Sequence, residues 1–340
     1  MAEKALLGNV EKSKDTQRRI DYDPLARRDS VMLDKSVLLA VGMFVMSVVV
    51  APGQDAPQTM TTVELQVALD RKGFGVGLID NRSGSKTRAA LSDFKKAAGL
   101  TVEGGLAAAL GVDKHPAFKD YIVTQQDVGR IGYAPADWVA AAAVPAMAAE
   151  SLSEVLSEKF HASEAYLSSL NPELSGWGTN AVEKTVRVPN VANAGSLPEA
   201  VRIVIDCRAF RLRAMDANNR IIASFPCSVA ADLSKVPKGA LSLATFAANP
   251  IYVFDPRNYP ESPRAQEIGR KLIIPAGSNC PVGEFWIGLN MPGFGIHGTP
   301  HPETIGRQES HGCFRLTNWD ILRLSKIVKF GMPVEVTGLN

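Results

Sequence analysis

A cysteine lies between polar side chains near the C-terminal end of the chain, in the segment Ser-His-Gly-Cys-Phe-Arg at residues 310–315. Sixteen residues before Cys313, His297 places an imidazole next to a glycine. A thiol attacks a carbonyl carbon as its thiolate, which a neighbouring imidazole can generate and stabilise. The residue types and their spacing therefore predict acyl transfer. Cys313 is the expected nucleophile, and His297 is the expected base that later returns a proton to the leaving amine.

Neighbouring groups could support this chemistry. The backbone N–H groups of Gly312 and Cys313 are candidate donors to a developing oxyanion. His311 could polarise the thiolate or hold the loop. The planar guanidinium of Arg315 could pair with a substrate carboxylate or brace the loop from below.

A zinc site is the competing interpretation, because His297, His301, His311 and Cys313 would make a plausible ligand count. A structural zinc site would be expected to bring more thiolates, and positions 311 and 313 are only two residues apart. We therefore predict no metal and no cofactor. An inert, buried cysteine is the remaining alternative.

The residues that must position this cluster follow a β pattern from Val201 onward. A turn is expected at 216–219, and Thr317 or Asn318 can cap a late helix that begins near Trp319. The pattern predicts a mainly antiparallel sandwich or barrel, with the cysteine in the loop between a strand that ends near 296 and the late helix. The predicted strands are 201–206, 209–215, 220–225, 241–247, 252–255, 285–289 and 334–337.

Two helical patterns precede this β region, at 61–73 and 87–99, with a glycine-containing loop between them. The Leu-Gln pair, the Gly-Phe…Ile-Asp loop, Gly-x-x-Thr and Ala-Leu-x-x-Phe resemble the small helical peptidoglycan-binding domain. Asn81-Arg82-Ser83 departs from the Asp-Gly usual in that loop. The resemblance predicts a peptidoglycan-binding-like domain at 59–112.

Residues 120–192 combine two short amphipathic helices, stopped at Asn171-Pro172, with strands near 121–123 and 186–190. This order resembles a LysM module, a strand–helix–helix–strand unit that binds N-acetylglucosamine chains, with an extended insertion after the first strand. His161 is most simply a surface residue of a helix.

The N-terminal part of the chain differs from the rest in composition. Residues 1–35 carry mixed charge and few aromatics, which predicts a disordered cytoplasmic stretch or a signal n-region. Residues 36–53 hold an apolar run followed by Pro-Gly-Gln, which fits a signal h-region or an uncleaved membrane anchor formed by 36–51. Both interpretations predict export to the periplasm or wall side of the cell envelope, and the second adds anchoring in the inner membrane.

The net charge and the remaining cysteines bear on binding partners and on disulfide bonds. A net charge of +2 gives no case for nucleic-acid binding. Cys207 and Cys227 flank the expected turn at similar distances, so they could form a disulfide or remain buried free thiols. Cys280 is assigned no role. At 340 residues the chain is predicted to be a multidomain α+β protein.

Residues 200–338 resemble the L,D-transpeptidase (YkuD-like) catalytic domain. The resemblance rests on His297, on Ser-His-Gly-Cys-Phe-Arg-Leu-Thr-Asn-Trp-Asp from Ser310, and on the flanking Pro-Val-Gly and Gly-Ile-His-Gly-Thr segments. It implies that the Gly298 carbonyl orients the histidine. The implied catalytic residues are Cys313, His297, His311 and Gly298, and the implied substrate or oxyanion residues are Ser310, Gly312, Arg315 and Thr299.

The resemblance also implies a reaction. The thiol would attack after the third residue of a wall stem peptide, release D-alanine and pass the acyl group from a thioester to a neighbouring stem, giving a 3–3 cross-link. Peptidoglycan stem peptides and glycan strands are the expected partners. Water as acceptor would make an L,D-carboxypeptidase, and a protein lysine would make a wall-attachment enzyme. A non-catalytic, wall-anchoring protein is the alternative from another class.

Overall fold

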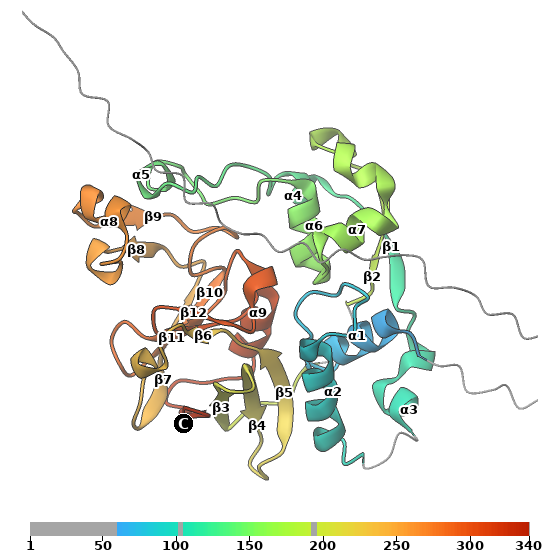
Figure 1. Ribbon diagram of the computed structural model, residues 1–340. Helices are drawn as coiled ribbons and strands as arrows, with labels where there is room; N and C mark the ends of the chain where they lie inside the picture. The colour runs from blue at the N-terminus through green and yellow to red at the C-terminus, as the bar shows by residue number, and fades with distance from the viewer. Residues whose placement is uncertain (1–59, 101–104, 192–195, 340) are drawn as a thin grey trace, which may run out of the picture. The chain divides into compact units, whose positions relative to one another are not determined.

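The computed structural model of this protein describes residues 60–100, 105–191 and 196–339 (Figure 1). The stretches 1–35 and 36–53, for which disorder and a signal or anchor are predicted, lie outside these residues. Among the residues that are described, no helix is both long and apolar enough to cross a membrane.

A small helical lobe begins at Thr61, which caps the first helix through a capping box with Glu64. Its core is apolar, and the buried amide of Gln66 organises the following loop by donating to Asp80 and accepting from the Asp80 and Asn81 N–H groups. The glutamine of the predicted Leu-Gln motif therefore fixes the conformation of the loop that follows α1. The lobe contains α1 (Thr62–Arg71), α2 (Ser85–Ala97), α3 (Leu106–Leu110) and η1 (Val112–Lys114).

The next segment has the predicted strand–helix–helix–strand order, although its first strand starts earlier than expected. The two strands pair antiparallel, with Asp120 opposite Arg187. An insertion of two short helices separates the first strand from the helical pair. The elements are β1 (Phe118–Ile122), α4 (Gln125–Val128), α5 (Trp138–Ala141), α6 (Leu152–Phe160), α7 (Glu164–Leu170), η2 (Pro172–Gly176), η3 (Thr179–Ala181) and β2 (Thr185–Pro189).

The prediction that His161 lies at the surface is wrong. His161 ends α6 in the left-handed conformation, with φ +55°, and its side chain is buried. The imidazole Nδ1 lies 3.0 Å from Asp70 Oδ1, and the ring stacks on Trp319. The turn that ends the helix therefore directs this side chain inward, toward both other lobes.

The C-terminal lobe is built on a mixed eight-stranded sheet. Most of its neighbouring strands are antiparallel, as predicted, while β14 with β3 and β11 with β13 run parallel, as do β12 and β6 in a separate two-stranded sheet. The elements are β3 (Arg202–Asp206), β4 (Arg211–Met215), β5 (Ile221–Pro226), β6 (Val229–Ala230), η4 (Leu233–Lys235), β7 (Leu241–Ala248), β8 (Tyr252–Phe254), η5 (Pro256–Asn258), α8 (Pro263–Ile268), β9 (Leu272–Ile274), β10 (Phe285–Leu289), β11 (Gly295–His297), η6 (Pro302–Thr304), β12 (Gln308–Ser310), β13 (Phe314–Arg315), α9 (Asn318–Ser325) and β14 (Pro333–Thr337).

The sheet and α9 share one apolar core. Ile203, Leu212 and Phe225 of the sheet are fully buried in the same cluster as Phe314 and Ile321. All seven predicted strands and the late helix are present, and Thr317 caps α9 as expected. The short elements β6, β9, β12, β13 and α8 were not predicted, because two to six residues carry too little periodicity.

A buried ionic network joins the helical lobe to the sheet. The Arg211 side chain is 1% exposed and donates to the Gly75 carbonyl at 2.9 Å and to Ser224 Oγ. Asp93 of α2 accepts from Arg213 and from Ser224 Oγ. Each buried charge thus has a partner of opposite sign or a hydrogen bond, as burial requires.

Candidate functional site

Two short strands bring the predicted cysteine loop next to the predicted base. In the parallel pair of β11 and β13, His297 lies opposite Arg315, and Cys313 immediately precedes β13. The Ser228 and Arg315 backbones exchange hydrogen bonds of 2.9 and 3.0 Å on the other side of β13. The loop between Ile296 and α9 therefore lies where the sequence predicts it.

His297 is buried, and its orientation is fixed from two sides. Its Nδ1 lies 2.6 Å from the Gly298 carbonyl, which is the contact expected for Gly298. A hydrogen bond to a carbonyl requires Nδ1–H, so Nε2 is the acceptor atom of this imidazole. The ring also stacks on Trp286 at 5.5 Å. Burial and the charge of Arg315 lower the pKa of His297 to about 4, so the ring is neutral at pH 7.

Cys313 is half-buried at the end of its loop. Its Sγ lies 3.5 Å from the Gly293 carbonyl, so in this conformation the thiol donates to the backbone. Burial raises the pKa of the Cys313 thiol, while the Gly295 backbone hydrogen bond and the charge of Arg315 oppose that rise. The thiol and the imidazole are therefore both neutral at pH 7, so an attack by this thiol would require a proton transfer.

Ser310 and Gly312 shape the loop. Ser310 Oγ donates to the Cys313 carbonyl at 2.6 Å and accepts from the Gly312 N–H at 3.3 Å. Gly312 has φ +149°, and a Cβ there would lie 2.7 Å from the Phe294 ring. Only glycine fits this position. Because the Gly312 N–H is engaged by Ser310, the Cys313 N–H is the better candidate oxyanion donor.

His311 contacts an acidic and an aromatic side chain. Its Nε2 lies 3.0 Å from Glu261 Oε1, and its ring meets Tyr259 edge-on at 4.8 Å. Of the two roles considered for His311, this geometry favours holding the loop over polarising the thiolate.

Arg315 and Thr299 flank the histidine. Arg315 Nη1 lies 3.5 Å from Glu309, and its buried Nε has no hydrogen-bond partner within the part of the chain that the structure describes. Thr299 is buried, and its Oγ1 accepts from the His301 N–H at 3.2 Å. The Thr299 hydroxyl thus braces the loop after Gly298, while Arg315 retains donor capacity toward a bound anion.

The four residues weighed as zinc ligands do not converge. His301 faces Glu303 at 3.5 Å and His311 faces Glu261, while His297 is held by its own neighbouring carbonyl. Across the described ranges, no three His, Cys, Asp or Glu side chains are grouped to hold a metal ion.

The other three cysteines, Cys207, Cys227 and Cys280, are buried free thiols. Burial raises the pKa of Cys207 to about 11, and it raises the pKa of Cys227 and Cys280 as well. All three side chains are almost fully buried, whereas Cys313 is partly exposed, so Cys313 is the thiol that a substrate can reach.

A cavity of about 820 Å³ adjoins the cysteine loop. One wall comes from the sheet lobe and includes Thr299, His311 and Arg315, while the other comes from the insertion, α6 and the start of α7. Sequence reasoning missed this second wall, because nothing in the local pattern of 124–158 relates it to a loop more than 140 residues away. Its side chains include Ala134, Trp138, Met147, Glu150, Glu154, Glu158 and Glu164.

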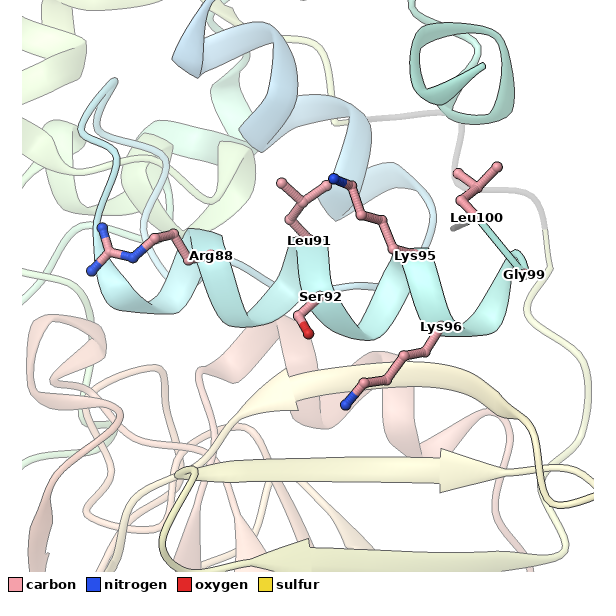
Figure 2. A pocket seen from close by; sticks show the side chains of 7 residues that line it. All are labelled: Arg88, Leu91, Ser92, Lys95, Lys96, Gly99 and Leu100. Atoms are coloured by element: carbon pink, nitrogen blue, oxygen red, sulfur yellow. The ribbon is translucent and has the colours of Figure 1, made fainter. Parts of the chain in front are cut away.

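A second hollow, of about 590 Å³, lies on α2 of the helical lobe (Figure 2). Arg88, Lys95 and Lys96 give it cationic groups, and Leu91 and Leu100 give it an apolar floor. In Figure 2, Leu91 and Lys95 project to one side of the helix and Lys96 to the other. The hollow is thus a basic surface groove rather than an enclosed site.

Two families match parts of this chain. Residues 200–336 match the family described as "L,D-transpeptidase catalytic domain", and residues 61–106 match that described as "Putative peptidoglycan binding domain".

Several known proteins are similar over the same region. The chain is 26% identical over 184 residues to "Putative L,D-transpeptidase YkuD" of Bacillus licheniformis, covering 54% of this chain and 92% of that protein. It is 27% identical over 150 residues to "Putative L,D-transpeptidase YqjB" of Bacillus subtilis, covering 42% of this chain and 75% of that protein. A solved "L,D-transpeptidase from Mycobacterium smegmatis" is 19% identical with a TM-score of 0.32, covering 45% of this chain and 66% of that one.

Proposed function

Because residues 200–336 of this chain are an L,D-transpeptidase catalytic domain, we propose that the protein is a cysteine L,D-transpeptidase that forms 3–3 peptidoglycan cross-links through a thioester. The observation that carries the proposal is the pairing of β11 with β13. That pairing puts the strand that begins just after Cys313 next to the strand that ends at His297, whose neutral imidazole donates Nδ1–H to the Gly298 carbonyl. A thiol beside an oriented base is the arrangement that acyl transfer requires.

In the first half-reaction, Cys313 Sγ attacks the carbonyl carbon of the third stem residue. His297 Nε2 takes the thiol proton as the S–C bond forms, and the Cys313 N–H donates to the oxyanion. The bond between that carbonyl and the nitrogen of the fourth-position D-alanine then breaks. The proton passes from His297 to the departing amine, which leaves a thioester on Cys313.

In the second half-reaction, the side-chain amine of a neighbouring stem attacks the thioester carbonyl. His297 removes a proton from the attacking amine and returns it to the sulfur as the S–C bond breaks. The product is an amide between two third-position residues, and the thiol is regenerated.

The cavity beside the loop supports an amine as acceptor rather than water. Arg315 on one wall suits a stem carboxylate, and Glu154 and Glu303 are among the acidic groups that suit an incoming ammonium. Charge complementarity of this kind selects between partners more than it adds affinity.

The preceding segments support action on a polymeric substrate. A lobe matching a peptidoglycan-binding family keeps stem peptides at a high local concentration near a tethered active site. The basic hollow on α2 suits the carboxylates of the wall, and the strand–helix–helix–strand segment suits glycan. The protein then acts in the cell envelope, with 36–53 serving as export signal or anchor.

Mass spectrometry of products from purified disaccharide tetrapeptides tests the proposal. We expect a dimer whose mass equals two substrates less one alanine, with a bond between the two third residues. A tripeptide product alone would indicate a carboxypeptidase, and adducts on protein lysines would indicate a wall-attachment enzyme. Sacculus binding without any product would indicate the non-catalytic anchor.

A further inference from the structure

Four residues from four separate stretches of the chain form a hydrogen-bonded ring next to the His297 site. We call it the Glu158 ring; its members are Arg130, Glu158, Glu284 and Asn318. Arg130 Nη2 lies 3.3 Å from Glu158 Oε2 and 2.8 Å from Glu284 Oε1. Asn318 Nδ2 donates to Glu158 Oε1 at 2.5 Å, and the Glu284 N–H donates to Asn318 Oδ1 at 3.1 Å. The ring thus joins the insertion and α6 to the start of α9.

Asn318 extends this ring to the catalytic imidazole. Its side chain is buried, and Nδ2 also donates to the Ser278 carbonyl at 3.1 Å. Its Oδ1 packs so closely on the Gly298 backbone that a Cβ at Gly298 would collide with it. The Gly298 carbonyl is the acceptor for His297 Nδ1–H. A single side chain therefore separates Glu158 from the peptide group that orients the base.

We propose that Glu158 and Asn318 are positioning residues, which hold the Gly298 carbonyl against His297 so that the segment 118–191 sets the orientation of the catalytic base. The proposal rests on the proposed function to the extent that His297 is taken as the base. It assigns this segment a part in catalysis besides any binding of glycan.

Glu158 makes this hold sensitive to pH. Burial and the neighbouring Glu284 and Glu154 carboxylates raise its pKa to about 7, against the opposing effects of Asn318 and Arg130. The ionised carboxylate accepts a stronger hydrogen bond from Asn318 and pairs with Arg130. Protonation removes that ion pair. Asn318 is therefore less firmly fixed against Gly298 as the pH falls through 7.

The rate of acyl-enzyme formation with a tetrapeptide stem, measured from about pH 5 to pH 9, tests the proposal. In the native protein we expect an inflection near pH 7, with a loss of about tenfold on the acid side, as misplacement of a catalytic group produces. In Glu158→Gln this inflection disappears. In Arg130→Met it moves to higher pH, because a cation that lowers the pKa of Glu158 is gone. Glu173→Gln, an exposed glutamate of the same segment, behaves like the native protein.

An unchanged inflection in Glu158→Gln, or no shift in Arg130→Met, would overturn the proposal. So would a loss of rate in Glu158→Gln that is equal at every pH and accompanied by a lower melting temperature. The 15N shifts of the His297 imidazole give a readout independent of turnover. If the native protein forms no acyl-enzyme, the proposed function is refuted. In that case a change of the 15N shifts in Glu158→Gln still supports the positioning role of Glu158. Unchanged shifts overturn that positioning role.

Discussion

His161 and His297 are both buried imidazoles that stack on a tryptophan ring. His161 lies 5.1 Å from Trp319 at an interplanar angle of 8°, and His297 lies 5.5 Å from Trp286 at 19°. Burial lowers the pKa of both, so both are neutral at pH 7. The two imidazoles are therefore alike in burial, in aromatic stacking and in protonation state.

The two imidazoles differ in the partner of Nδ1. His161 faces the carboxylate of Asp70, which also binds Arg323 at 2.8 Å, and these three residues come from the three lobes. His297 faces a neutral backbone carbonyl, and its strand pairs with the strand that follows Cys313. The comparison teaches that burial and stacking alone do not separate an imidazole with a structural role from a candidate catalytic one. The two differ in the partner of Nδ1, a carboxylate for His161 and a backbone carbonyl for His297.

The largest expected effect is a difference between replacing His297, which should affect the reaction rate, and replacing His161, which should affect stability. We expect His297→Gln to lower the rate of acyl transfer about 10³-fold, because a general acid–base group is lost. His161→Gln should leave that rate within about threefold and lower the free energy of unfolding by about 1–3 kcal/mol, because the buried Asp70 carboxylate loses a donor. Single-turnover kinetics and urea unfolding of both variants check this. Similar losses of rate in the two variants would remove the distinction.

The second prediction concerns how the free energy of unfolding changes with pH because of His297. The folded-state pKa of His297, about 4, is below its unfolded value of about 6.5, so the unfolded state binds more protons between these values. The neutral ring therefore contributes stability above pH 6.5 that is lost as the pH falls toward 4, amounting to about 3 kcal/mol. His297→Gln should lose less free energy of unfolding than the native protein between pH 7 and 4. Parallel curves for the two proteins would refute this.

The smallest effect comes from the junction around His161. Burial raises the pKa of Asp320 to about 7, and neither carboxylate oxygen has a hydrogen-bond partner among the residues that the structure describes. A raised pKa contributes stability that is present below the unfolded value and lost as the pH rises through 7. Asp320→Asn should therefore be more stable than the native protein at pH 8, by about 1–2 kcal/mol. Equal stability at that pH would show that Asp320 finds a partner when ionised.

The sequence predicts residues whose role is encoded locally. The seven strands, α9 with its Thr317 cap, and the Cys313 loop follow from periodicity and from a contiguous motif. The role of His161 does not, because its partners Asp70 and Trp319 are about 90 and 160 residues away and only the tertiary fold brings them together. Asn318 stood in the recognised motif, yet its contact with Glu158 likewise needs the fold.

The central claim is that Cys313 carries the acyl group, and intact-mass spectrometry after mixing the protein with a tetrapeptide stem tests it most directly. We predict an adduct with the mass of the tripeptide acyl group, located on Cys313, present in Cys207→Ala and Cys280→Ala and absent from Cys313→Ala. An adduct of the same size in Cys313→Ala, or turnover without Cys313, would contradict the account.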